Sequence, residues 1–391
     1  MRDFLNSRVK DLKPSGIRKF FDLAAGRKDV ISLGVGEPDF VTPWEIRSAG
    51  INALKQGKTQ YTSNQGLLEI REEIEKYLKE RFSIRFNASE MVITLGASEA
   101  IDVTLRAVVD VGDEILVPDP SYVSYKPCIE LAGGKAVAVR CDGENGFKLT
   151  PEELKKVITP KTKALIFPYP NNPTGGIMEK EYIEAIIPVI LEHDLLVISD
   201  EIYAELTYGD RHCSICAFPQ LEGRCVLISG FSKAFAMTGW RIGFVCAPQP
   251  IFSAILKIHQ YTSICAPSFS QYAALAGLRN GREDCYSTVE QMRDEYDRRR
   301  KFMHKTFTEM GLDCFEPKGS FYLFPSVEKT GLTGDEFAVK LLEEKKVAVV
   351  PGSAFGDFGL NYIRCSYAYS MQNLIKATAQ IAEFVEELIK R

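Results

Sequence analysis

The stretch CVLISGFSKAFAMTGWRIGFVC, residues 225–246, decides the fold because it joins two apolar runs through a short, chemically distinct segment. The runs CVLISG (225–230) and RIGFVC (241–246) are almost continuously apolar, which is typical of strands buried on both faces of a sheet. Lys233 lies between them, among Phe, Ala, Met and Gly residues. The pattern therefore puts a lysine at the carboxyl end of a buried strand, where open α/β sheets bind their ligands.

Five further runs of the same kind lie upstream. They are MVITLG (from Met91), EILVP (from Glu114), KAVAV (from Lys135), KALIFP (from Lys163) and LLVISD (from Leu195). Helical patterns such as EYIEAIIPVILEH (181–193) separate several of these runs. This alternation predicts an α/β fold with a mostly parallel seven-stranded sheet and helices on both of its faces.

The two ends of the chain show a different pattern. After residue 280 come a long charged helix (281 to about 310), GSFYLFP (319–325), a helix from Thr333 to Lys345, VAVVP (347–351), YIRCSY (362–367) and a last helix (371–390). This order predicts a smaller α+β domain. Residues 1–45 are too few and too interrupted by Pro and Gly to form a core, so we expect them to pack on it. We thus expect an N-terminal segment (1–45), a large domain (46–280) and a small domain (281–391).

Composition excludes several classes of function. The chain has 391 residues and a net charge of -4, with Lys and Arg scattered, which argues against nucleic acid or an anionic membrane as partner. No apolar run approaches the roughly 20 residues of a membrane span, and the N-terminus lacks a secretory pattern. Most of the ten cysteines stand singly in apolar stretches, which indicates a reducing, cytoplasmic setting. His212, Cys213 and Cys216 lack a second pair of ligands, so we expect no metal site.

The segment SKAFAMTGWRIG (232–243) resembles the pyridoxal-phosphate lysine signature of class I/II aminotransferases, which share the aspartate aminotransferase fold. Seven further motifs follow the family's order: YTSNQGLLEIREEI (61–74), TLGASEAI (94–101), DPSYVSY (119–125), PNNPTGG (170–176), SDEIY (199–203), GSFYLFP (319–325) and YIRCSYA (362–368). The resemblance spans roughly residues 14–370. It is closest to a bacterial and archaeal subgroup of aspartate, aromatic and acyl-diaminopimelate aminotransferases.

This resemblance implies pyridoxal 5'-phosphate as cofactor and Lys233 as its covalent anchor. A lysine buried among apolar side chains has a lowered pKa and becomes nucleophilic. Asp200, at the end of LLVISD, would pair with the pyridine nitrogen and keep the ring an electron sink. Asn172 and Tyr203 resemble the pair that hydrogen-bonds the cofactor's 3′ oxygen, and Tyr122 the aromatic residue stacked on the ring.

The resemblance also implies a phosphate site. Ala97 and Ser98 would offer backbone N–H groups at the N-terminus of a helix, a position that attracts anions. Arg241 would bind two phosphate oxygens as a fork, and Ser232 is a further candidate. Tyr61 resembles a tyrosine that reaches the phosphate across a subunit interface, which implies a homodimer with shared sites.

The substrate residues follow in the same way. Arg364 resembles the arginine that clamps the substrate α-carboxylate, helped by Asn172. Gly36, in GVGEPDF, resembles a glycine whose backbone approaches that carboxylate, and Arg18 would approach the substrate side chain. Some bacterial aspartate enzymes carry a lysine where this chain has Ser98, which argues against strict aspartate specificity.

The implied reaction is transamination between an L-amino acid and a 2-oxo acid, with Lys233, Asp200 and Tyr203 as catalytic residues. The donor would be of the aspartate, aromatic, alanine or acyl-diaminopimelate type, and 2-oxoglutarate or a similar acid the acceptor. One alternative is a pyridoxal-phosphate β-lyase that cleaves C–S bonds on the same fold and releases ammonia and pyruvate. Another is a cofactor-binding regulator without catalysis, for which the 32 residues before Leu33 lack a basic DNA-binding region.

Overall fold

A seven-stranded sheet forms the centre of the computed structural model, which describes residues 3–10, 12, 14, 16 and 29–390. In spatial order its strands are β2 (Met91–Thr94), β8 (Gly243–Cys246), β7 (Cys225–Gly230), β6 (Leu196–Asp200), β5 (Thr162–Phe167), β3 (Glu114–Asp119) and β4 (Lys135–Arg140). All neighbours are parallel except at β8, which runs antiparallel to both β2 and β7. The seven runs expected from the sequence are these strands, and the mostly parallel α/β sheet is confirmed.

Helices cover both faces of the sheet because successive strand side chains point to opposite sides. Val92 and Val245 belong to one buried layer, which contains α5 (Ala97–Val108), α6 (Tyr125–Ala132) and α9 (Ile251–Thr262). Their neighbours Ile93 and Phe244 face the other side. That side is covered by α4 (Leu68–Phe82), α7 (Pro151–Val157), α8 (Lys180–Glu192) and α10 (Ser268–Glu283), with α3 (Trp44–Lys55) packed on α10.

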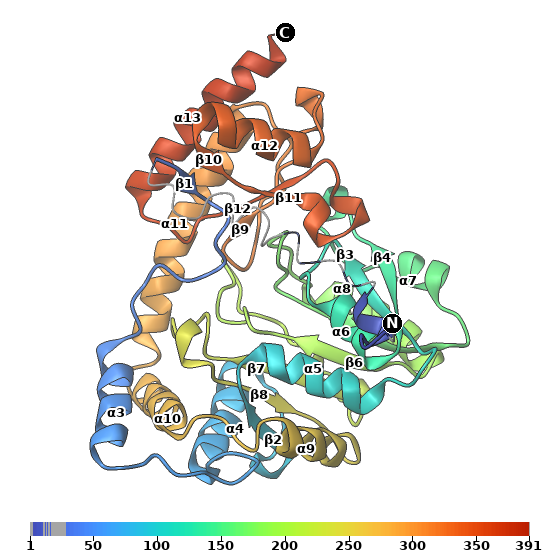
Figure 1. Cartoon of the computed structure of the whole chain (residues 1–391), viewed down its shortest axis with the longest axis vertical. Helices are drawn as coiled ribbons and strands as arrows, with labels where there is room; N and C mark the ends of the chain where they lie inside the picture. The colour runs from blue at the N-terminus through green and yellow to red at the C-terminus, as the bar shows by residue number, and fades with distance from the viewer. Residues whose placement is uncertain (1–2, 11, 13, 15, 17–28, 391) are drawn as a thin grey trace.

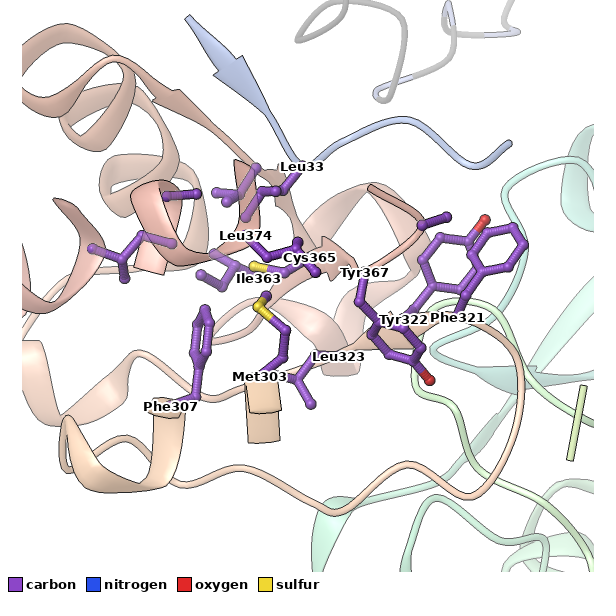
Figure 2. Packing of buried hydrophobic residues seen from close by; sticks show 14 of the residues in the cluster. Leu33, Met303, Phe307, Phe321, Tyr322, Leu323, Ile363, Cys365, Tyr367 and Leu374 are labelled. Carbon is purple, nitrogen blue, oxygen red and sulfur yellow. The ribbon is translucent and has the colours of Figure 1, made fainter. Parts of the chain in front are cut away.

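Both ends of the chain build the smaller α+β domain, in the upper part of Figure 1. Strand β1 (Ile31–Ser32) pairs in parallel with β10 (Val347–Ala348), while β11 (Val350–Pro351), β12 (Ile363–Ser366) and β9 (Tyr322–Leu323) form an antiparallel sheet in that order. The helices here are α11 (Ser287–Glu309), α12 (Gly334–Lys345) and α13 (Met371–Ile389); the short α1 (Ser7–Lys10) lies beside α6. Figure 2 shows Leu33 over Ile363, Cys365 and Leu374, so an N-terminal side chain completes a C-terminal core.

The structure differs from the expectation at three places. The charged helix begins at Ser287 and not at residue 281, because α10 continues to Glu283 and Cys285 and Tyr286 turn the chain with φ of 56° and 57°. VAVVP splits into β10 and β11, which belong to different sheets. Arg241 precedes β8 and does not open it, since its φ of 51° is incompatible with a strand.

Candidate functional site

A cavity of ≈ 860 Å³ lies at the carboxyl ends of β6 and β7, roofed by residues of the smaller domain. Its lining contains most of the residues singled out from the sequence: Gly36, Ala97, Ser98, Tyr122, Asn172, Asp200, Tyr203, Ser232, Lys233, Arg241 and Arg364. It also contains Glu37, Tyr125, Thr238 and Tyr322, which the sequence interpretation did not single out. Residues from eight of the quoted sequence stretches thus converge on one space.

Lys233 follows β7 and its amine enters this cavity. Its Nζ donates a hydrogen bond to the carbonyl oxygen of Gly36 at 2.7 Å. Burial lowers the pKa of Lys233 to about 8; Glu37 acts against this shift, and the positive charge of Arg364 adds to it. About a tenth of the amine is therefore uncharged at pH 7, far more than for an ordinary lysine, and can act as a nucleophile or a base.

Asp200 ends β6 and is buried, with both carboxylate oxygens engaged. The Tyr125 hydroxyl donates to Oδ2 at 2.7 Å, and the backbone N–H of Ile202 donates to Oδ1 at 3.2 Å. Burial raises the pKa of Asp200 to about 6, against the effect of these two hydrogen bonds. The group is still mainly an anion at pH 7 and faces the cavity, where it can bind a cationic ring nitrogen.

Tyr203 and Tyr322 form a buried pair whose hydroxyl oxygens lie 3.0 Å apart. Burial raises the pKa of Tyr203 well above its usual value, so the phenol stays protonated. Tyr322 also lies beneath Arg364, whose guanidinium carbon is 4.3 Å from the ring centroid. Tyr322 stands in the quoted motif GSFYLFP and Tyr125 in DPSYVSY, and this membership was the only sequence signal for either residue.

Arg364, on β12, is 2% exposed and reaches the cavity from the smaller domain. Its Nη1 donates to Asn172 Oδ1 at 2.9 Å, and its Nη2 donates to the carbonyl oxygen of Gly34. Its Nε is buried without a partner among the described residues. Buried donors are normally satisfied, so this N–H is available to an acceptor such as a carboxylate that enters the cavity.

The N-terminus of α5 and Arg241 lie side by side in the lining of the cavity. Gly96 caps α5 with a φ of 83°, and a Cβ there would lie 2.8 Å from Arg241 Nη2. Only glycine permits both this backbone angle and this approach. Arg241 donates to the carbonyl oxygens of Thr238 (3.0 Å) and Leu95 (3.1 Å), which fixes its guanidinium beside Ala97 and Ser98. A helix N-terminus and a guanidinium together suit a phosphate group.

Tyr61 and the cysteines Cys213 and Cys216 do not line the cavity. Tyr61 is 81% exposed, and Arg18 lies outside the described residues. Cys213 and Cys216 are free thiols, and the preceding His212 is hydrogen-bonded to Glu201 at 2.8 Å. Within the described ranges, no group of three or more His, Cys, Asp or Glu side chains is arranged to hold a metal ion. No helix among those described is long and apolar enough to cross a membrane.

Comparison with known proteins gives the same result as the geometry. The family model for class I and II aminotransferases matches residues 28–381. An aspartate aminotransferase of Pyrococcus abyssi is 47% identical over 98% of this chain and 98% of its own length. The aromatic-amino-acid aminotransferase 2 of Thermococcus litoralis is 43% identical, also over 98% of each chain. The structure of Thermus thermophilus aspartate aminotransferase with maleate matches with a TM-score of 0.93 at 36% identity, over 98% of this chain and 100% of the other. The chain therefore belongs to the class I and II aminotransferases and is an enzyme that transfers amino groups.

Proposed function

We propose that this cavity binds pyridoxal phosphate and catalyses amino transfer between an L-amino acid and a 2-oxo acid. One observation carries the proposal: the Lys233 amine, the Asp200 carboxylate and the N-terminus of α5 face a single cavity. An amine suits the cofactor's aldehyde, a carboxylate its pyridine nitrogen, and a helix N-terminus its phosphate. The residues present therefore fit the cofactor at these three functional groups.

Each residue near the ring has a separate task in this proposal. Lys233 anchors the cofactor covalently, and Asp200 holds its ring nitrogen in the protonated form. Tyr203 and Asn172 donate hydrogen bonds to its phenolic oxygen, while Tyr122 stacks on the ring. When bound, the cofactor supplies an electron sink that stabilises negative charge on the substrate α-carbon.

The phosphate would be held by fixed dipoles and one permanent charge. Ala97 and Ser98 would donate backbone N–H groups, and Arg241 a forked pair of hydrogen bonds. Ser232 lines the cavity and is a further donor candidate. Tyr61 would reach the phosphate of the neighbouring subunit in a homodimer, which would account for an aromatic side chain that stands in solvent in the isolated chain.

Lys233 would also carry the proton during the reaction. With its pKa lowered to about 8, its Nζ can take the proton from the substrate α-carbon and would then deliver it to C4′ of the cofactor, so that acid and base are one residue. Asp200 and Tyr203 assist by their fixed charge and hydrogen bond.

Substrate recognition would combine a specific site for the α-carboxylate with a less specific site for the substrate side chain. Arg364 and Asn172 would bind the α-carboxylate, with the Gly36 backbone alongside. We infer from Ser98 that the enzyme is not restricted to aspartate, since a lysine there would serve a distal carboxylate. Arg18 would approach the substrate side chain, so R18A should weaken the use of dicarboxylic substrates selectively; an equal loss for all substrates would contradict this role.

The architecture and setting complete the proposal. We propose a division into residues 1–45, 46–280 and 281–391, with Arg364 brought to the cavity by the last of these units. All ten cysteines are free thiols, which supports a reducing, cytoplasmic location.

Half-reactions test the function directly. The cofactor-loaded protein is mixed with single amino acids, without a 2-oxo acid, and the cofactor's absorbance spectrum is followed. Conversion to the amine form of the cofactor, with release of a 2-oxo acid, is the expected result, and the ranking of rates identifies the donor. Release of pyruvate and ammonia with an unchanged cofactor spectrum would identify a C–S β-lyase. Retention of the cofactor without turnover of any amino acid would favour a regulatory protein.

A further inference from the structure

Asp119 joins the large sheet to the smaller domain. It is the last residue of β3 and is 8% exposed. Its Oδ2 accepts the backbone N–H of Asp357 at 3.0 Å, and its Oδ1 accepts that of Phe358 at 3.2 Å. Both N–H groups belong to a short turn of 3-10 helix, Asp357–Gly359, in the smaller domain. One carboxylate therefore holds two consecutive N–H groups of the other domain.

The surrounding backbone is shaped for this contact. Gly356 has a φ of 145°, and a Cβ at that position would collide with the Asp119 carboxylate. Two residues beyond Asp119, the N–H of Ser121 donates to the carbonyl oxygen of Phe355 at 3.0 Å. Three hydrogen bonds thus connect residues 119–121 to residues 355–358, and glycine is needed where the two segments approach most closely.

These three hydrogen bonds form a joint between the domains, and residues of the proposed site follow it closely in both chain segments. On the large-domain side the chain continues into Tyr122 and Tyr125, which line the cavity, and Tyr125 bonds Asp200. On the other side, the N–H of Tyr362 donates to the carbonyl oxygen of Gly359 at 2.9 Å, two residues before Arg364. The joint thus lies between the residues that face the cofactor and the arginine that faces the substrate.

We propose that Asp119 is a positioning residue, an interdomain latch that sets the placement of Arg364 relative to the Tyr122–Tyr125 segment and thereby the affinity for carboxylate substrates. The substrate part of this inference rests on the proposed function. The latch itself is a contact between two segments of the chain and is testable without substrate.

The charges around Asp119 make the latch sensitive to pH. Burial raises the pKa of Asp119 to about 6; the two N–H donors and Lys126 act against the shift, and Asp357 adds to it. Cys141 and Arg140 on the β4 side also face it, with Arg140 opposite Asp119 in the sheet and 5.6 Å from the Phe358 ring centroid. Protonation replaces an acceptor oxygen with a hydroxyl donor, so the grip on the two N–H groups weakens as pH falls through about 6.

Amide hydrogen exchange of the holoenzyme tests the latch. In D119A, exchange at the N–H groups of Asp357 and Phe358 should accelerate on the order of tenfold, because each loses a hydrogen bond to a charged group. D119N keeps the shape and one acceptor oxygen, so its effect should be smaller. The matched control is D335N, because Asp335 is exposed and accepts a hydrogen bond from Ser353 at 2.5 Å within the smaller domain. This substitution should leave the exchange rates of the Asp357 and Phe358 amides unchanged. Unchanged exchange in D119A would overturn the latch.

Kinetics test the positioning role. D119A should raise the KM for the amino acid about tenfold while kcat changes much less, because binding geometry is lost and the cofactor residues are kept. The wild-type KM should rise below pH 6, and D119N should lack this step. An unchanged KM in D119A would overturn the positioning role. If exchange responds but no amino acid is converted by the wild type, the proposed function fails and the latch is supported separately.

Discussion

Asp200 and Glu201 are neighbours at the end of β6, both buried, yet they face opposite sides of the sheet. Asp200 points into the cavity and receives one side-chain donor, the Tyr125 hydroxyl. Glu201 points away from it and receives three: Ser199 and Ser214 at 2.7 Å each on Oε1, and His212 Nε2 at 2.8 Å on Oε2.

The difference separates a carboxylate that is directed at the cavity from one that is held by the fold. A carboxylate has about four acceptor positions, and those of Glu201 are largely filled by the fold. Asp200 keeps acceptor capacity directed at the cavity and carries the cost of burial, seen in its raised pKa. A buried carboxylate with unfilled acceptor positions is thus typical of a ligand site, whereas a neighbouring carboxylate whose acceptor positions are filled by the protein serves to hold the fold together.

Substitution of Asp200 should give the largest effect. D200N removes the charge that faces the cavity and that we propose to hold the cofactor's ring nitrogen, and kcat should fall by about 10²–10³-fold, as when one fixed electrostatic contact to a reacting system is lost. Folding should not suffer, because the neutral amide lacks the burial cost of the carboxylate. The measurements are single-turnover rates and urea unfolding of the same preparations. A fall in activity that merely tracks the folded fraction would assign Asp200 to the framework instead.

Glu201 should behave in the reverse manner. E201Q keeps the size of the side chain but opposes one donor with its own NH₂ group, so the free energy of unfolding should drop by about 2–3 kcal/mol. The rate per folded molecule should stay within a few-fold of the wild type. A tenfold or larger loss of kcat in fully folded E201Q would show that the two carboxylates are not separable in function.

The third prediction concerns the stability of the cofactor-free protein as a function of pH. The pKa of Asp200 is about 6 in the folded chain and about 4 in the unfolded chain, so the folded state binds more protons between these values. Its contribution therefore falls as pH rises from about 4 to 6, by about 3 kcal/mol in total. D200N should lack this part of the slope, while the part due to Asp119 remains because the pKa of Asp119 is also raised to about 6. Identical pH profiles of wild type and D200N would contradict the burial argument.

The sheet and the strand ends could be predicted from the sequence, whereas the hydrogen-bond partners of the buried side chains could not. Seven short apolar runs predict the sheet because strands buried on both faces leave no other pattern. The position of Lys233 at the carboxyl end of a strand could be predicted because it follows such a run, whereas the role expected for Asp200 came from the family resemblance. The partners of Asp200 and Tyr203 could not: Tyr125 is 75 residues away from Asp200 and Tyr322 is 119 away from Tyr203, and an aromatic residue near a strand is ordinarily core.

The network around Glu201 shows the same limit. In the sequence, His212 adjoins Cys213 at a place where we expected no metal site, and no other role for it could be predicted; in the structure it completes the set of donors to Glu201. The break between α10 and α11 was missed for a local reason. It depends on positive φ angles at Cys285 and Tyr286, residue types that carry no turn signal.

The smallest expected effect tests how the Glu201 network divides its contribution. S214A removes one of the two hydroxyl donors to Oε1 and the bond from the Cys216 N–H to Ser214 Oγ, so unfolding should become easier by about 1 kcal/mol, with kcat unchanged. S199A is the matched variant, since Ser199 donates to the same oxygen from β6 itself. Urea unfolding of both variants and of the double variant gives their coupling. If the losses of unfolding free energy in the two single variants add up in the double variant, the two hydroxyl donors act independently. If one substitution alone costs as much as E201Q, the Glu201 carboxylate needs all of its donors at once. In that case the complete filling of its acceptor positions, and not the number of hydrogen bonds, distinguishes it from Asp200.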